Sequence, residues 1–519
     1  MGKLPLISEN QDLIVVLIIY SILALFSINY YHFNLGADGI SYISIALKYV
    51  NGDWANAING VWSPLYSWLM IPILLISYKP AYAPYVTRIV SLIVGFFTII
   101  GISRLSSTFN LDTPIKRAVL MTSIPMILFF AIFYDTPDLL VACLLTYYFS
   151  IIFKSNYVDK WINGVSCGFI GAMAFLSKSY IFPFFLVHFT LFNILFYFKS
   201  LNNKKKVKKN LILGLSIFVI ISGIWVGLIS EKYDKITVST ATDYNHAVMG
   251  PDYPDYPIYN MGLIKPTNPT ANSIWEDPYF VKLKDWSPFE SWENFSYQLE
   301  LISKNLYLVV VTIEYYSILS LVIIIISFYL ILKSEMNKSF KNKLTYILIT
   351  IAIYSAGYCL IFIQERFLWP VIILIMLNGF YLTKILYETE KIDSRLRNVL
   401  LIILVFSFML SPAYELFVYP HTDDGIYSLS QTLQSDFGIH GNIASNGNWE
   451  KTLQISYYLN SQYYGLPRNV NNSAELEKEL LASNITYYFV WGDSSNVRFL
   501  NYNEITNGKI NGLRIYAQI

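Results

Sequence analysis

Charged residues are scarce in this sequence. Only 14% of its 519 residues are Asp, Glu, Lys or Arg, whereas a soluble domain carries roughly 25%. The apolar excess, 55% of residues with a mean hydropathy of +0.44, is gathered in blocks of about twenty residues, the length that crosses a bilayer. This pattern excludes a soluble globular domain and indicates a polytopic membrane protein. We expect no nucleic-acid ligand.

Cysteine is also rare. The three cysteines, Cys143, Cys167 and Cys359, all lie inside apolar runs, so they offer neither a disulfide framework nor a cysteine-based metal site. A small-x-small cleavage site is missing after the first apolar run, 13–28, which we therefore expect to be a retained first helix. No internal repeat is visible in the sequence.

The apolar runs predict about eleven transmembrane helices, with the N-terminus inside. After 13–28, the expected spans are 83–103, 118–134, 138–153, 161–178, 181–198, 211–229, 306–332, 344–362, 367–386 and 399–417. With this orientation Lys and Arg gather in the inside loops, as the positive-inside rule requires, and almost none lie in the short outer connections. The inside residues include Arg104, Lys116, Arg117, Lys154, Lys160, Lys199, the run Lys204 to Lys209, Lys333, Lys343, Lys384 and Arg397.

Three segments are expected outside the spans. Residues 34–82 predict short interfacial helices, because Trp and Tyr mix there with Asn and Asp. Residues 231–305, rich in Pro and Tyr, predict an ordered outer loop without regular secondary structure. The tail, 418–519, predicts a small extracytoplasmic α/β domain. The fold class is therefore an all-α polytopic membrane domain, 1–417, followed by that small domain.

Ionisable residues next to the apolar runs are candidate functional residues, because a charge at the bilayer centre costs about 2.5–3.5 kcal/mol. They collect at the outer ends of the spans: Asp38, Asp135, Asp138, Lys178, Glu365 and Arg366, with Arg88 slightly deeper. Such a ring defines a site that lipid reaches from the side and water from above. Acids with Lys and Arg suit a reaction that needs a general base and stabilises a phosphate leaving group.

Several motifs in this region resemble the GT-C class of membrane glycosyltransferases, close to the dolichyl-phosphate-mannose–protein mannosyltransferase and aminoarabinose-transferase branch (glycosyltransferase family 39). In chain order they are Asp38-Gly39-Ile40-Ser41-Tyr42, Gly52-Asp53-Trp54, Pro64-Leu65-Tyr66-Ser67-Trp68-Leu69, Thr136-Pro137-Asp138, Phe175-Leu176-Ser177-Lys178 and Glu365-Arg366-Phe367-Leu368-Trp369-Pro370. One position departs from the branch, which has Asp-Glu where Gly39 follows Asp38. This leaves open whether a second carboxylate assists, and whether it is Asp138.

The resemblance implies transfer of a sugar from a polyprenyl-phosphate carrier to an acceptor hydroxyl, with inversion, on the extracytoplasmic side of the membrane. Asp38 would be the general base and Asp138 would assist it or bind the sugar. Arg366 and Lys178 would hold the phosphate. Protein, lipid or envelope glycan would accept the sugar; no cofactor is specified, and a divalent metal is possible.

Four further side chains are substrate-binding candidates, and several candidates also have plainer explanations. Tyr42 is expected to stack on a sugar face, and Glu365 and Arg88 belong either to the site or to interfacial ion pairs. His246 is either a ligand contact or a solvated loop residue. Asp38 itself fits an Asp-Gly turn, Asp138 fits a helix N-cap, and Lys178 fits a snorkelling lysine.

Two other functions stay open at this point, and a third, a structural scaffold, is disfavoured. An oligosaccharide ligase or polymerase would use a diphosphate donor and a metal held by paired acids, and the first outer segment shows no Asp-x-Asp. A lipid or sugar transporter would place binding residues near the midplane, often in repeated halves. A structural scaffold would not need acids and bases at one depth.

Overall fold

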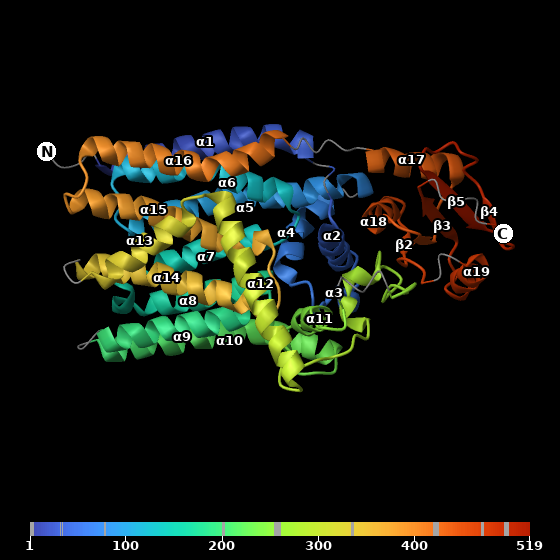
Figure 1. Ribbon diagram of the computed structural model, residues 1–519, viewed down its shortest axis with the longest axis horizontal. Helices are drawn as coiled ribbons and strands as arrows, with labels where there is room; N and C mark the ends of the chain where they lie inside the picture. Colours follow the sequence, from blue (N-terminus) through green and yellow to red (C-terminus); the bar gives the residue numbers. More distant parts are fainter. Residues whose placement is uncertain are drawn as a thin grey trace.

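The computed structural model describes residues 5–31, 33, 35–76, 79–199, 203–253, 261–333, 337–418, 425–468, 472–492 and 498–519. Asn34, the first residue of the expected interfacial segment, and residues 254–260 of the expected outer loop lie outside this set. Helices run side by side along the long axis, and a small α/β unit stands at the end opposite the N-terminus (Figure 1). The chain is thus a helical bundle with a small α/β unit at one end.

Apolar helices form the bundle. They are α1 (Pro5–Tyr31), α5 (Ala83–Thr108), α6 (Thr113–Phe133), α7 (Asp138–Ile152), α8 (Trp161–Ser177), α9 (Ile181–Lys199), α10 (Lys204–Lys232), α14 (Lys338–Cys359), α15 (Trp369–Glu388) and α16 (Ser394–Val418), with the 3-10 turn η2 (Tyr157–Asp159) between α7 and α8. Each segment expected to span the membrane is largely helical in the structure, although one of them is broken. These apolar helices indicate that the chain is a multi-pass membrane protein.

The number of full-length spans is smaller than the sequence predicts. Among the described residues, seven helices are long and apolar enough to cross a membrane, or eight if one bent pair counts as a span, instead of about eleven. Two of the expected spans, 138–153 and 161–178, correspond to α7 and α8, which have only 15 and 17 residues. Hydropathy does not separate such short buried helices from full spans, because both are apolar on all sides.

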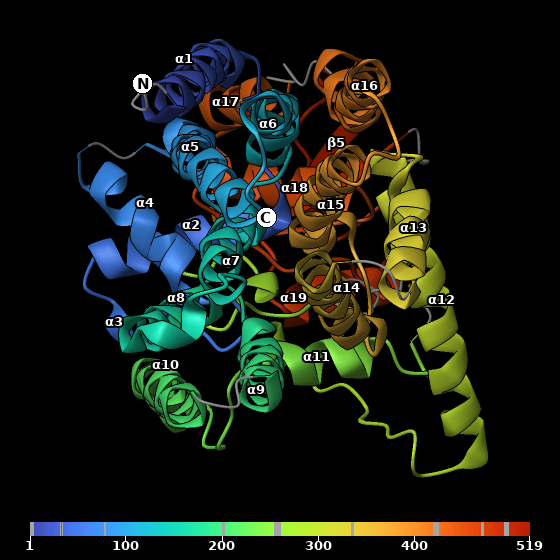
Figure 2. The same ribbon diagram turned by 90° about the vertical axis from the view of Figure 1, so that its left-hand side faces the viewer.

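The expected span 306–332 is wrong as a single helix. The chain there forms α12 (Trp292–Tyr316) and α13 (Ser320–Leu332), which meet at an angle of 105°. Ser317 ends α12 in extended conformation (φ −162°), and this backbone breaks the helix. Figure 2 shows α12 on the outside of the bundle.

Helix α15 lies at the centre of the bundle (Figure 2). Its residues Trp369 to Ile385 are all buried, because the helix is apolar around its whole circumference. The ring of Trp369 stacks on Phe130 of α6 with centroids 4.0 Å apart. The turn η6 (Glu365–Leu368) directly precedes this helix, so central packing fixes the position of Arg366.

The interfacial segment forms three helices, α2 (Ala37–Val50), α3 (Trp54–Ala57) and α4 (Pro64–Ile76), followed by the turn η1 (Pro80–Tyr82). Helix α2 packs on α4, where the Ser67 hydroxyl donates a hydrogen bond to the Tyr42 carbonyl (2.9 Å). Short helices were expected here, and the structure adds the single turn of α3. The packing fixes the direction in which the first turn of α2 presents Asp38.

The outer loop is more regular than the sequence predicts. It contains α11 (Ala241–Val248) and the turns η4 (Ile274–Glu276) and η5 (Pro278–Phe280), and α12 already begins at Trp292. The expectation of a loop without regular secondary structure is therefore wrong. The high proline content of the segment argued against regular structure, and it did not reveal these short helices.

The C-terminal unit is a mixed sheet with helices. Its elements are α17 (Gly425–Phe437), β1 (Asn442–Ser445), α18 (Trp449–Tyr458), β2 (Gln462–Tyr463), α19 (Ser473–Ala482), β3 (Tyr487–Trp491), β4 (Tyr502–Glu504) and β5 (Leu513–Gln518). The strand order is β2-β1-β3-β5-β4. Strand β1 is parallel to both neighbours, with Ile443 opposite Tyr463 and Tyr487, and β5 is antiparallel to β3 and β4. This confirms the small α/β fold expected for the tail.

Candidate active site

Asp38 lies in the first turn of α2 and receives two hydrogen bonds. Arg366 Nη2 donates to Oδ2 at 2.7 Å, and Trp275 Nε1 donates to Oδ1 at 3.0 Å. The side chain is still 20% exposed, so a substrate hydroxyl can reach it. A carboxylate in the first turn of a helix is also stabilised by the N–H groups there.

Asp138 is the first residue of α7. Arg366 lies between Asp138 and Asp38 and contacts both carboxylates. Lys178 Nζ donates to Asp138 Oδ1, the Thr136 hydroxyl donates to Oδ2 at 2.7 Å, and Arg366 Nε lies 3.6 Å from Oδ2. The side chain caps no backbone N–H of α7. The N-cap explanation therefore does not account for Asp138, whose carboxylate bonds to two cations instead.

Lys178 follows the last turn of α8, where its backbone becomes extended (φ −155°, ψ 125°) and ends the helix. Its ammonium lies 3.5 Å from the centroid of the Phe367 ring, in the range of a cation–π contact. With Asp138 on one side and Phe367 on the other, the ammonium is held at the site and does not reach toward water. Snorkelling does not explain this position.

Arg366 connects the two acids. Its guanidinium reaches Asp38 with Nη2 and Asp138 with Nε, and Nε also donates to the Gln364 side-chain oxygen at 2.9 Å. Its side chain is 14% exposed. Two cations and two carboxylates thus balance in charge around one point, and the fork of the guanidinium can exchange a carboxylate for a phosphate oxygen.

These residues line a cavity of about 820 Å³ that has a polar end and an apolar end. The polar end contains Asp38, Tyr42, Trp62, Asp138, Lys178, Trp275 and Arg366. The apolar end is formed by α9 and the last turns of α14, and it includes Phe182, Pro183, Phe184, Val187, Ile353, Ala356 and Leu360. An amphiphile with an anionic head and a hydrocarbon tail matches this division.

A second buried pair of opposite charges lies beneath α2. Arg88 of α5 is 1% exposed and Asp135 is 5% exposed. Burial raises the pKa of Asp135, and the positive charge of Arg88 partly opposes that rise. The Gly36 N–H, just before α2, donates to Asp135 Oδ2 at 2.9 Å. Neither residue lines the cavity. Asp135 instead supports the start of α2 through its hydrogen bond with the Gly36 N–H.

The structure brings together Asp38, Asp138, Lys178, Arg366 and Tyr42 in the cavity, and places the other three candidates elsewhere. Glu365 accepts a hydrogen bond from the Tyr316 hydroxyl of α12. Arg88 lies with Asp135 as described above. His246 stacks on Trp286, with ring centroids 4.7 Å apart, and burial lowers its pKa. The substrate-binding role of these three residues stays a prediction.

The sequence predicted neither Trp275, which lines the cavity, nor the buried ion pair of Lys48 with Glu276, the residue that follows Trp275. Lys48 Nζ lies 2.5 Å from Glu276 Oε1, with side chains 2% and 3% exposed. The only sequence signal was a lysine inside the apolar helix of residues 43–50. Its partner is 228 residues away, so the sequence did not indicate the pair. Within the described part of the chain no three His, Cys, Asp or Glu side chains gather as metal ligands.

Comparisons by sequence find no matching family model and no matching curated protein. Comparison by structure finds ArnT from Cupriavidus metallidurans bound to undecaprenyl phosphate, with a TM-score of 0.56 and 11% identity over 97% of this chain and 98% of that one. The chain has the fold of ArnT. The apo state of ArnT gives a TM-score of 0.53 and 10% identity over 98% of both chains.

A second solved protein has a similar fold. The apo oligosaccharyltransferase from Archaeoglobus fulgidus aligns with a TM-score of 0.54 and 11% identity, over 92% of this chain and 69% of that one. The resemblance to the GT-C class that the motifs indicate is thereby confirmed at the level of the fold. Fold alone does not carry an activity, so the function is argued from the site.

Proposed function

We propose that this protein is a membrane glycosyltransferase that moves a sugar from a polyprenyl-phosphate carrier to an acceptor hydroxyl. The observation that carries the proposal is the cavity itself, in which the carboxylate of Asp38 and the cations Arg366 and Lys178 meet an apolar groove. ArnT was crystallised with undecaprenyl phosphate, a ligand with the same division into anionic head and hydrocarbon tail. Tyr42 and Trp62 border the polar end, where aromatic faces suit a sugar ring.

The reaction requires one proton transfer and one displacement. The acceptor oxygen forms a bond to the anomeric carbon while Asp38 takes the hydroxyl proton as general base. The bond from that carbon to the phosphate oxygen breaks on the opposite face, and its electron pair leaves with the phosphate. Attack from the opposite face inverts the anomeric carbon. Arg366 and Lys178 stabilise the departing anion.

Donor binding changes the partners of Arg366. Without donor, its guanidinium is neutralised by Asp38 and Asp138. A phosphodiester that takes over the guanidinium fork releases Asp38 Oδ2, which then faces the acceptor. Asp138 keeps its bond to Lys178 and holds that ammonium toward the phosphate.

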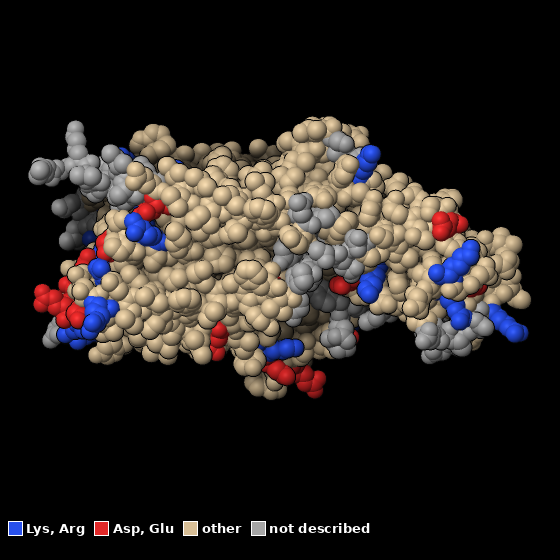
Figure 3. All heavy atoms as spheres, turned by 90° about the horizontal axis from the view of Figure 1, so that it is seen from above, with Lys and Arg blue, Asp and Glu red and all other residues tan. Residues whose placement is uncertain are grey.

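The proposed orientation places the cavity and the C-terminal domain, 418–519, outside the cytoplasm. Figure 3 shows Lys and Arg together with Asp and Glu at the end of the bundle opposite the C-terminal domain and again on the C-terminal half of the molecule, with few charged atoms on the bundle between. The Lys-rich start of α10, which includes the run Lys204 to Lys209, lies at the first of these ends (Figure 1). The positive-inside rule then puts the basic end in the cytoplasm. Protein, lipid or envelope glycan on the outer side would supply the hydroxyl.

The test is transfer from a panel of radiolabelled polyprenyl-phosphate sugars in membranes that carry wild type, Asp38→Asn or Asp112→Asn. Asp112 lies at the far end of the bundle and is a matched control for loss of a carboxylate. We expect transfer by wild type and Asp112→Asn, and none by Asp38→Asn although it still binds donor. Equal activity of Asp38→Asn would show that Asp38 is not the base. Silence of wild type with every monophosphate donor would contradict the proposal and favour a diphosphate donor or transport.

A further inference from the structure

Residues 261–281 of the outer loop, here called the strap, contribute Trp275 and Pro278 to the lining of the cavity. Within the strap, Trp275 points its indole N–H at Asp38 Oδ1 (3.0 Å), across 237 residues of sequence. Arg366 holds the other oxygen of the same carboxylate. With one donor on each oxygen, the carboxylate cannot rotate about its axis without losing a hydrogen bond.

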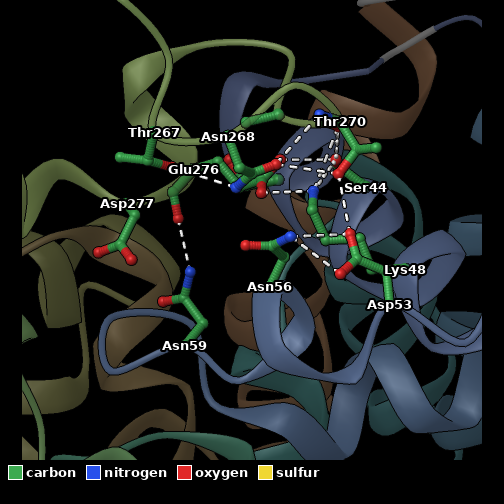
Figure 4. A network of polar contacts seen from close by, with 12 residues as sticks. Ser44, Lys48, Asp53, Asn56, Asn59, Thr267, Asn268, Thr270, Glu276 and Asp277 are labelled. Carbon is green, nitrogen blue, oxygen red and sulfur yellow. Dashed lines mark hydrogen bonds and ion pairs between the residues drawn. The ribbon is translucent and has the colours of Figure 1, made fainter. Parts of the chain in front are cut away.

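The strap is anchored on the interfacial helices immediately after Trp275. Glu276 receives hydrogen bonds from Lys48 Nζ (2.5 Å) and the Ser44 hydroxyl (2.6 Å), and its backbone carbonyl accepts from Asn59 Nδ2 (2.7 Å). Figure 4 shows Ser44 and Lys48 of α2 converging with Thr270 and Glu276 of the strap. These bonds are buried, so water does not compete for them.

The strap is anchored on the C-terminal sheet immediately before Trp275. Tyr463 N donates to the Asn272 carbonyl (2.7 Å) and Ile264 N to the Tyr464 carbonyl (2.9 Å), so the strap runs along the edge strand β2. Gln462 Nε2 also donates to the carbonyls of Asn268 (3.0 Å) and Ala271 (2.9 Å). Addition of an extended segment to a sheet edge is a stable mode of recognition.

We infer that Trp275 is a positioning residue that sets the orientation of the Asp38 carboxylate, and that the C-terminal sheet holds Trp275 in place through the strap. The inference rests on the proposed role of Asp38 as the base. It gives the C-terminal domain a part in building the active site. Gln454 of that domain adds a second connection, because its Nε2 donates to the Leu35 carbonyl (2.6 Å) just before α2.

The kinetic test compares Trp275→Phe with Trp286→Phe. Both remove an indole N–H from the outer loop, but Trp286 donates to the His246 carbonyl and does not line the cavity. We expect Trp275→Phe to lower kcat by about tenfold to a hundredfold, the usual effect of a misaligned catalytic group, with the donor KM unchanged and the acid limb of the pH–rate profile displaced. Trp286→Phe should match wild type. A Trp275→Phe enzyme with wild-type kcat and pH profile would overturn the inference.

The role of the sheet edge is tested by Gln462→Ala against Gln434→Ala, a glutamine that is exposed on α17. Gln462→Ala should raise hydrogen exchange in residues 261–276 and lower kcat, while Gln434→Ala changes neither. If hydrogen exchange in the strap and kcat are both unchanged in Gln462→Ala, the C-terminal sheet does not hold Trp275 in place.

If no transfer can be detected, a double-mutant cycle based on unfolding temperatures tests the contact between Trp275 and Asp38. Trp275→Phe should lower the unfolding temperature in the wild-type background, and by less than half as much in the Asp38→Ala background, because coupled partners are not additive. Fully additive shifts would overturn the inference. Failure of wild type to transfer any sugar would instead contradict the proposed function, so the two failures are distinguishable.

Discussion

Asp135 occupies the space that a side chain at position 39 would need. A Cβ atom added to Gly39 would lie 1.8 Å from Asp135 Oδ2 and 2.3 Å from its Cγ. The branch of glycosyltransferases that the motifs resemble has a glutamate at this position. Here that space is taken by the carboxylate of Asp135, which comes from the connection between α6 and α7 and accepts a hydrogen bond from the Gly36 N–H.

Substitution of Gly39 by alanine should therefore damage the site. The added Cβ must push Asp135 or tilt α2, and either movement displaces Asp38. We expect Gly39→Ala to lower the unfolding temperature and to reduce transfer by about a hundredfold, as misplacement by 1 Å can do. Gly223→Ala on α10 is the control, because nothing lies within 4 Å of its added Cβ. A Gly39→Ala protein that behaves like Gly223→Ala would contradict this packing.

Arg366→Lys should be a severe substitution although it keeps the charge. A lysine places its donors on one nitrogen, whereas the guanidinium uses separate nitrogens for Asp38 (Nη2) and for Gln364 and the ion pair with Asp138 (Nε). An ammonium also does not present two parallel donors to phosphate. We expect kcat to fall by about 10²- to 10³-fold, the usual loss when a donor to a developing anion is removed. Arg104→Lys, on an exposed residue of α5, should leave the rate unchanged. Near-normal kcat in Arg366→Lys would remove Arg366 from the phosphate site.

The buried ion pair of Lys48 with Glu276 should dominate the stability of the strap. Lys48→Met leaves the Glu276 carboxylate, 3% exposed, without its cation, which costs about 3–5 kcal/mol. The unfolding temperature in detergent should fall accordingly. Lys284→Met breaks an ion pair with Asp252 whose side chains are 70% and 45% exposed, and exposed pairs contribute about 0–1 kcal/mol. Equal effects of the two substitutions would show that the Lys48 pair is not desolvated.

Asp277, next to Glu276, should make the stability of the loop depend on pH. Burial raises the pKa of Asp277 to about 6, opposed by the hydrogen bond from the Tyr233 hydroxyl and by the charge of Lys232. Because the pKa of this carboxyl is higher in the folded than in the unfolded state, its protonated form stabilises the folded protein at pH values below the unfolded-state pKa. This stabilisation is lost as the pH rises through about 6. The loss amounts to about 3 kcal/mol.

The measurement compares unfolding temperatures of wild type and Asp277→Asn across this range. Wild type should lose stability relative to Asp277→Asn as pH rises from about 4 to 6.5, and the difference should be constant above about 7. Asp243→Asn, which removes an exposed carboxylate from the same loop, is the control. A difference that grows toward acid pH would have the wrong sign for a raised pKa.

The sequence by itself determined the membrane class, the positions of most apolar helices and five of the residues that meet in the cavity. These features depend on local composition, because a run of apolar residues must enter the bilayer and a charge beside it must leave its centre. Asp38, Asp138, Lys178 and Arg366 were visible for this reason. Tyr42 was visible as an aromatic residue in the same interfacial segment.

Only the tertiary structure decided which of these charges pair, where α12 bends, and what holds Asp38. Trp275 and Glu276 lie more than 200 residues from Asp38 and Lys48, and no periodicity in the sequence connects such distant partners. Glu365, His246 and Arg88 carry the same chemistry as the cavity residues, yet packing turns them toward Tyr316, Trp286 and Asp135. The direction of a side chain depends on the elements packed around it, and that information is not local.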